Sequence, residues 1–99
     1  MVKFGILATL EAKIGKEHEV AAFLKSALPL VEAEPGTVSW FVIRVPHTYF
    51  GIFEAFRDEA GRDAHLAGEV AKALMAKAPE LFSQPPKIEK VDVLASKLG

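Results

Sequence analysis

The stretch of sequence that decides the fold is Tyr49-Phe50-Gly51-Ile52-Phe53-Glu54-Ala55-Phe56-Arg57, followed by Asp58-Glu59-Ala60 and then Ala64-His65-Leu66. Its aromatic and apolar residues predict a strand that leads directly into a helix. The strand carries one carboxylate, Glu54, among apolar neighbours, and the helix carries one histidine, His65. A carboxylate in a buried strand is costly unless it is paired or used. This segment is therefore where the fold and any chemistry are expected to meet.

Alternation of side chains and β-branched or aromatic runs predict further strands on both sides of this segment. The four predicted strands cover residues 2–14, 37–45, 49–57 and 87–98. Gly15 ends the first alternating run, and Pro46-His47 forms a tight turn between the two middle strands.

Helical spacing fills the two remaining intervals. The first helix carries an apolar stripe made of Val20, Phe23, Leu24, Ala27, Leu28 and Val31. Pro29 lies on its outer face and is predicted to bend this helix rather than end it, whereas Glu34-Pro35-Gly36 stops it. Asp58 is a good N-cap for the second helix, Gly68 divides that helix in two, and Pro79 ends or kinks it. Its predicted apolar stripe is Ala60, Ala64, Ala67, Ala71, Leu74 and Ala78.

The resulting order β-α-β-β-α-β is the split βαβ, or ferredoxin-like, plan of an α+β protein. Its 99 residues form a single domain, 1–99, with helices on one face of an antiparallel sheet. In a monomer the other face should be polar, but residues 40–45 and 49–56 are apolar on both faces. We therefore expect a homodimer in which a second copy covers the open face.

Composition excludes several classes of partner. Twelve basic and 13 acidic residues give a net charge of −1, so there is no basic field to attract nucleic acid. Cysteine is absent, which excludes disulfides and thiolate chemistry. The apolar runs are too short to span a membrane, and the N-terminal residues lack the pattern of a signal peptide. A soluble cytoplasmic protein is the expectation.

The sequence contains no recognisable metal or cofactor motif. His18, His47 and His65 have no ligand neighbours at helical spacing, and His18 and His47 are expected on the solvated surface. The scattered glycines form neither a dinucleotide fingerprint nor a P-loop. The third strand lacks the basic residue and the aromatic pattern of RNA-recognition domains. We expect no metal, no bound cofactor and no nucleic acid.

The candidate site residues are Glu54 and His65 together with Trp40, Arg44, Tyr49, Phe53 and Phe56. Considered alone, Glu54 is expected to pair with Arg44 or Arg57 or to accept a hydrogen bond from His65. At such a position a structural ion pair is commoner than a catalytic base. His65 is expected on the flank of its helix, partly buried, and the aromatic residues are expected in packing. The functional interpretation rests on convergence of an acid, a histidine and several aromatics beside a helix rich in small residues, which leave room for a pocket.

The segment Glu54-Ala55-Phe56-Arg57-Asp58-Glu59-Ala60, with His65-Leu66 after it, resembles the signature of the antibiotic biosynthesis monooxygenase (ABM) domains. The family pattern is Glu-x-Trp, a short polar turn, Ala and then His-Leu. Two positions depart from it: Phe56 stands where tryptophan is usual, and Val70 stands where many members carry a second histidine. The resemblance implies a dimeric α+β barrel with a pocket in each subunit. In some members the pocket oxygenates quinols or polycyclic phenols with molecular oxygen and no metal or flavin.

The expected function is a cofactor-independent monooxygenase that acts on a small aromatic, quinol-like substrate. In this hypothesis His65 is the base and Glu54 orients it, because the unperturbed pKa of histidine lies near neutrality. Trp40, Tyr49, Phe53 and Phe56 are expected to wall the substrate, and Arg44 to hold a developing oxyanion. Two alternatives stay open: a non-catalytic dimeric protein that binds small molecules, and a cofactor-free isomerase or decarboxylase on the same scaffold.

Overall fold

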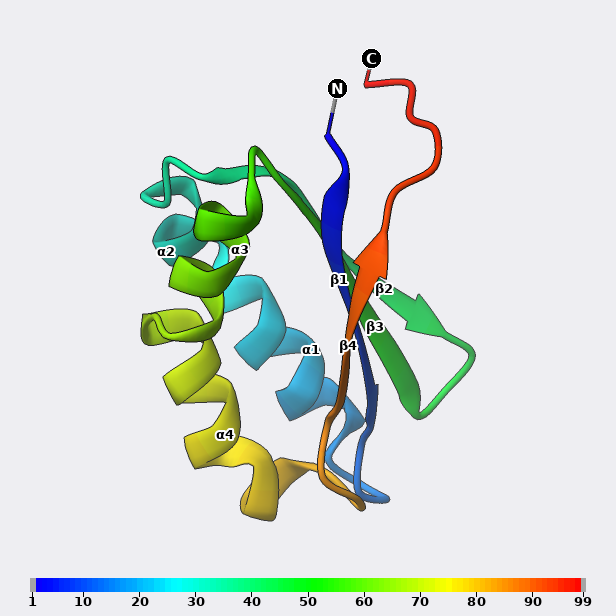
Figure 1. Ribbon diagram of the computed structural model, residues 1–99. Helices are drawn as coiled ribbons and strands as arrows, with labels where there is room; N and C mark the ends of the chain where they lie inside the picture. The colour runs from blue at the N-terminus through cyan, green and yellow to red at the C-terminus, as the bar shows by residue number, and fades with distance from the viewer. Residues whose placement is uncertain (1, 99) are drawn as a thin grey trace.

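The computed structural model describes residues 2–98 and contains one four-stranded antiparallel sheet with helices on one face (Figure 1). The elements are β1 Phe4–Glu11, α1 Glu17–Ser26, α2 Leu28–Glu32, β2 Thr37–Val45, β3 Tyr49–Phe56, α3 Glu59–Leu66, α4 Glu69–Leu81 and β4 Lys87–Asp92. The strand order is β2-β3-β1-β4, with every pair antiparallel. The predicted ferredoxin-like α+β fold is confirmed.

The first and last strands of the chain, β1 and β4, are shorter than the alternation predicts. β1 stops at Glu11, and Ala12 forms an isolated bridge with Phe82 before the turn at Gly15, whose φ is +86°. β4 ends at Asp92, which pairs with Phe4 at the beginning of β1. Alternation alone does not show where a pairing partner ends, so both strands were predicted too long.

Pro29 divides the first helix, which corrects the prediction that it only bends it. α1 ends at Ser26, Ala27 is a turn, and α2 begins at Leu28 with Pro29 in its first turn. Proline has no N–H to donate and its ring clashes with the carbonyl four residues earlier, so a helix that meets it restarts more readily than it continues.

The second helical segment breaks at Gly68, as predicted. Asp58 caps α3 by accepting a hydrogen bond from the Gly61 N–H at 2.8 Å. Of the two alternatives predicted for Pro79, an end or a kink, the end is wrong, because α4 continues to Leu81.

The apolar stripe predicted for the second segment is wrong in α3. Ala60, Ala64 and Ala67 are exposed, whereas Arg62 and His65 are buried against the sheet. An alanine is small enough to be tolerated on either side of a helix, so a pattern built on alanines does not fix which side faces the core.

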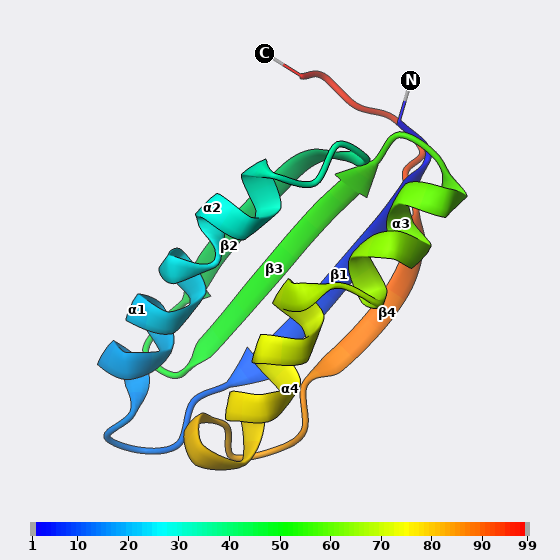
Figure 2. The same cartoon turned by 90° about the vertical axis from the view of Figure 1, so that its left-hand side faces the viewer.

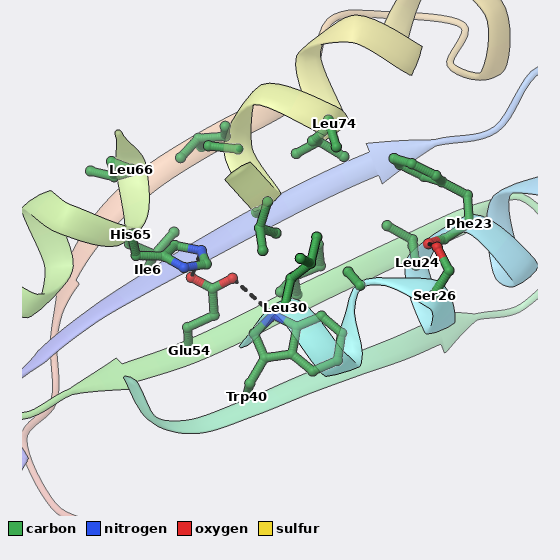
Figure 3. Close-up of a pocket in the computed structure, with 17 residues that line it drawn as sticks. Ile6, Phe23, Leu24, Ser26, Leu30, Trp40, Glu54, His65, Leu66 and Leu74 are labelled. Atoms are coloured by element: carbon green, nitrogen blue, oxygen red, sulfur yellow. Dashed lines mark hydrogen bonds and ion pairs between the residues drawn. The ribbon is translucent and has the colours of Figure 1, made fainter. Parts of the chain in front are cut away.

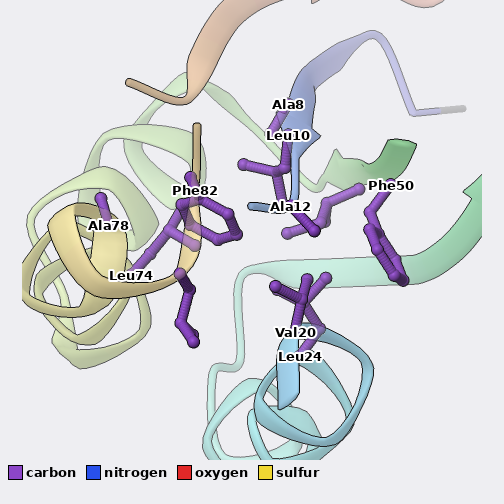
Figure 4. Close-up of a cluster of buried hydrophobic side chains, with 11 residues drawn as sticks. Ala8, Leu10, Ala12, Val20, Leu24, Phe50, Leu74, Ala78 and Phe82 are labelled. Atoms are coloured by element: carbon purple, nitrogen blue, oxygen red, sulfur yellow. The ribbon is translucent and has the colours of Figure 1, made fainter. Parts of the chain in front are cut away.

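The core lies between the sheet and the two helical pairs. Figure 2 shows α1 and α2 lying over the β2–β3 side of the sheet and α3 and α4 over the β1–β4 side. Figure 4 shows the cluster where α1 and α4 meet the strands, with Val20, Leu24 and Leu74 facing Leu10 and Phe50. This arrangement buries the helix-facing residues of β3, which are Phe50, Ile52, Glu54 and Phe56.

The opposite face of the sheet carries exposed apolar side chains. They are Leu7, Phe41, Ile43, Val45 and Tyr49, with the half-buried Phe53 between them. Phe41 is 55% exposed. No helix in the described part of the chain, residues 2–98, has the length and apolar character needed to cross a bilayer.

Candidate functional site

A pocket of about 80 Å³ lies between the helix face of the sheet and the helices that cover it (Figure 3). Its walls are apolar side chains from β1, β3, β4 and all four helices. The polar lining residues are Ser26, Trp40, Glu54 and His65. Figure 3 shows Glu54 and His65 at one end of the pocket and Ser26 with Phe23 at the other. An apolar cavity with a few converging polar groups is the usual form of a small-molecule site.

Glu54 enters the pocket because β3 alternates. Its neighbours Phe53 and Ala55 face the open side of the sheet, so the Glu54 side chain must face the helices, where it is 3% exposed. Its Oε1 accepts a hydrogen bond from the Trp40 Nε1–H at 3.1 Å. Its Oε2 lies 2.9 Å from Nε2 of His65. This contact forms an ion pair but lacks the alignment of a regular hydrogen bond, so Oε2 keeps acceptor capacity. Among the three partners considered from the sequence, His65 is the one observed.

His65 is more deeply buried than its predicted place on the helix flank. It is 5% exposed, and its ring packs against Phe56 with a centroid separation of 5.4 Å. Nδ1 donates to Oε1 of Glu34 at 2.6 Å, while Nε2 faces Glu54. Burial by itself lowers the pKa of His65, but the close contacts and negative charges of Glu54 and Glu34 outweigh it and raise the pKa above its usual 6.5. The two carboxylates thus favour the charged form of the imidazole that lies between them.

Glu34 is the site residue that sequence reasoning missed. It follows α2 in the Glu34-Pro35-Gly36 segment, which the sequence marks only as a helix stop. Its Oε1 accepts from both His65 and the hydroxyl of Thr37, the latter at 2.8 Å. The only available signal was an acidic residue next to a predicted turn, which is too common to indicate a site. We refer to Glu34, His65 and Glu54 as the triad.

The remaining predicted residues are not all brought together. Trp40 lines the pocket, and Phe56 lies beneath His65, fully buried. Arg44 is exposed, donates to the His47 carbonyl at 3.0 and 3.2 Å, and lies 5.3 Å from the centre of the Phe50 ring.

Tyr49 and Phe53 face the open side of the sheet, because both are an odd number of residues from Glu54 along β3. Neither lines the pocket of Glu54, and neither does Arg44, which lies near the far end of β2. Strand alternation thus separates Tyr49 and Phe53 from the acid and histidine that they were expected to accompany, whereas Arg44 shares the Glu54 face of the sheet but lies farther along β2, beside Phe50.

Across residues 2–98 no cluster of three or more histidine, aspartate and glutamate side chains is arranged to hold a metal ion. His18 and His47 are on the surface, as predicted.

Comparisons with known proteins place the chain by structure. No protein-family model matches the sequence, and no curated protein matches it. The NE2512 protein from Nitrosomonas europaea, whose crystal structure is described as that of a protein of unknown function, is 55% identical over 100% of this chain and 96% of that one, with a TM-score of 0.96. The chain belongs to the family of NE2512.

More distant structures share the fold. A putative antibiotic biosynthesis monooxygenase from Nitrosomonas europaea is 15% identical, covers 93% of this chain and 90% of its own, and has a TM-score of 0.82. One from Caulobacter crescentus is 21% identical, with coverage of 95% and 92% and a TM-score of 0.81. The chain thus has the ferredoxin-like fold of ABM proteins, which confirms the resemblance at the level of the fold.

Proposed function

We propose that this protein is a cofactor-independent monooxygenase that acts on a small aromatic, quinol-like substrate in the Glu54 pocket. The observation that carries the proposal is a buried carboxylate paired with a histidine at the polar end of an apolar pocket. Perturbed titratable groups converging on a cavity are typical of catalytic sites. The ABM names of structures with the same fold support the reaction class.

The reaction needs a base and a water-poor cavity. Direct reaction of a phenol with triplet oxygen is spin-forbidden, but a phenolate can pass one electron to oxygen and recombine with the resulting radical. One oxygen atom then enters the ring and the other leaves as water, while the phenol is oxidised to a quinone. The protein therefore has to remove a proton, stabilise the anion and keep bulk water out.

The contacts favour Glu54 over His65 as the proton acceptor. Both ring nitrogens of His65 are engaged, one by each carboxylate of the triad. Oε2 of Glu54 has no regularly aligned donor, although it is buried. A substrate hydroxyl can supply this donor, and the adjacent imidazole of His65 then lowers the cost of the extra charge at the site. This reverses the roles that the sequence alone suggested.

Entry of the substrate widens the pocket. Its volume of about 80 Å³ is smaller than the roughly 150 Å³ of an apolar cavity that binds benzene. The wall formed by Phe23, Ala27 and Leu30 includes the break between α1 and α2, where no continuous helix resists a small displacement.

Oxygen uptake with a panel of hydroquinones, in the presence of a metal chelator, tests the proposal. Glu54→Gln keeps the shape and the acceptor for Trp40 but removes the base, and we expect turnover to fall by about two to four orders of magnitude. Glu32→Gln is a matched control, because it removes the same charge from a residue that is exposed at the end of α2. If the wild-type protein consumes no oxygen with any hydroquinone but still binds phenols, it is a binding protein instead.

The proposal includes a homodimer built on the open sheet face. An exposed apolar surface that includes Leu7, Phe41, Ile43 and Phe53 on one sheet is unfavourable in water, and a second copy offers an identical complementary surface. Light scattering should give twice the chain mass of 10.7 kDa. Phe41→Asp should dissociate the dimer, because it buries an unpaired charge in the interface, and the same change at exposed Met75 on α4 should not. A monomeric wild-type protein would refute this part.

A further inference from the structure

The triad connects the pocket to the outside of the molecule. Glu54 lies on the inner side of His65, where its Oε2 is 2.9 Å from Nε2. Glu34 lies on the other side, where its Oε1 is 2.6 Å from Nδ1, and its side chain is 21% exposed. The imidazole ring is therefore the bridge between a buried acid and an acid in contact with solvent.

His65 also separates two cavities. The inner one is the apolar pocket, and the outer one, of about 380 Å³, is bordered by Glu34, Pro35, Gly61 and Ala64. His65 contributes to the lining of both. One carboxylate is sufficient to fix the orientation of a histidine, so the second acid needs another explanation. Its position between the ring and the outer cavity supplies one.

We propose that Glu34 is the proton exit of the site. The inference rests on the proposed function, which places a phenol hydroxyl against Glu54. The step starts from the neutral imidazole with its proton on Nδ1, facing Glu34. The hydroxyl proton passes to Oε2 of Glu54 while Glu54 passes a proton to the unprotonated Nε2 of His65. At the same time Nδ1 of His65 gives its proton to Oε1 of Glu34, which releases it to water in the outer cavity. The net result is one phenolate in the pocket and one proton in solvent, with both carboxylates unchanged and the imidazole proton moved from Nδ1 to Nε2.

This route explains how the pocket loses a proton without admitting water. A base enclosed by apolar walls holds each proton it accepts until the proton returns to the ligand or finds a way out. Arg62, the other buried charged side chain of α3, is engaged elsewhere, because it packs over the Phe4 ring and donates to the Gly5 carbonyl. Glu34 is the carboxylate that touches the outer nitrogen of His65.

Temperature-jump spectroscopy on the full chain with bound 4-nitrophenol tests the inference. A jump in Tris buffer changes the pH within microseconds, and the absorbance of the dye reports its ionisation. The dissociation rate of the dye is measured separately by competition with 4-nitroanisole, which has no proton to lose. In the wild type, ionisation of the bound dye should be at least about tenfold faster than dissociation.

The variants separate a proton route from a structural role. In Glu34→Gln, ionisation should slow to the dissociation rate, because the amide oxygen can still accept a hydrogen bond from His65 but cannot take up its proton and release it to water. In Glu34→Ala, added formate should enter the outer cavity and restore fast ionisation. This second variant keeps the test decisive if Glu34→Gln folds poorly. Glu32→Gln should behave as the wild type does.

Three results would overturn the inference: unchanged fast ionisation in Glu34→Gln, no rescue by formate in a folded Glu34→Ala, or no binding of the dye. The proposed oxygenase reaction fails by a different result, the absence of oxygen uptake by the wild type. The two failures can therefore be told apart.

Discussion

Replacing His65 with alanine should destabilise the protein by about 3–5 kcal/mol at pH 6, because it leaves a buried carboxylate without its counter-charge. Glu54 is 3% exposed, and its remaining partner would be the Trp40 N–H. The variant also opens a space beside the fully buried Phe56. A domain of this size has about 5–15 kcal/mol of total stability, so the loss is a large share of it.

Urea unfolding followed by the fluorescence of Trp40, the single tryptophan, measures this loss. With an m-value of about 1.5 kcal/mol/M, the midpoint should fall by about 2–3 M. The protein concentration must be held constant, because the proposed dimer would add to the apparent stability. His18→Ala is the matched control, since His18 is exposed and its loss should change stability by less than about 0.5 kcal/mol.

A double variant identifies the cause of the loss. Glu54→Gln removes the buried charge, so adding it to His65→Ala should recover stability relative to His65→Ala alone. If His65→Ala costs less than about 1 kcal/mol, the pair behaves like an exposed ion pair and the reasoning is refuted. The same expected loss makes Glu54→Gln, rather than His65→Ala, the better variant for testing catalysis.

Three further predictions concern pH and local structure. Because the folded state raises the pKa of His65 above 6.5, protonation of His65 contributes fully to the free energy of unfolding below pH 6.5, and this contribution is lost as the pH rises through the folded-state pKa. Urea midpoints should therefore decline over that range, and His65→Gln should flatten the decline. Asp58→Ala removes the N-cap of α3 and should cost about 1 kcal/mol, measured by the same unfolding assay. Gly36→Ala should cost about 1–3 kcal/mol, since its Cβ would lie 2.8 Å from Cα of Gly61; an unchanged melting temperature would contradict this packing.

The inner half of the site could be predicted from the sequence. β3 is a strongly apolar strand, so alternation determines which residues share a face, and a lone Glu54 among them signals a paired or functional group. The cap at Asp58 and the break at Gly68 likewise follow from local chemistry. These features depend on residues close to one another in the chain.

The outer half could not be predicted, because it depends on contacts between distant segments. Glu34 and His65 are 31 residues apart, and nothing local to either residue indicates the other. The same limitation affected α3, where the alanines suggested one buried face and the tertiary structure selects the face with Arg62 and His65. Side-chain patterns on one element define its options, and the packing of neighbouring elements chooses among them.

Two glycines make the contact between Glu34 and His65 possible. Gly36 follows Glu34 by two residues, and Gly61 lies one turn before His65 on α3. A Cβ on either would lie 2.8–3.2 Å from backbone atoms of the other, so a side chain at either position would push α3 away from the loop that carries Glu34. The Arg57 N–H donates to the Gly36 carbonyl at 2.9 Å and fixes this loop to the end of β3, the strand that carries Glu54. The close approach of two backbones thus sets the distances of the whole triad, and the sequence records it only as two glycines in separate segments.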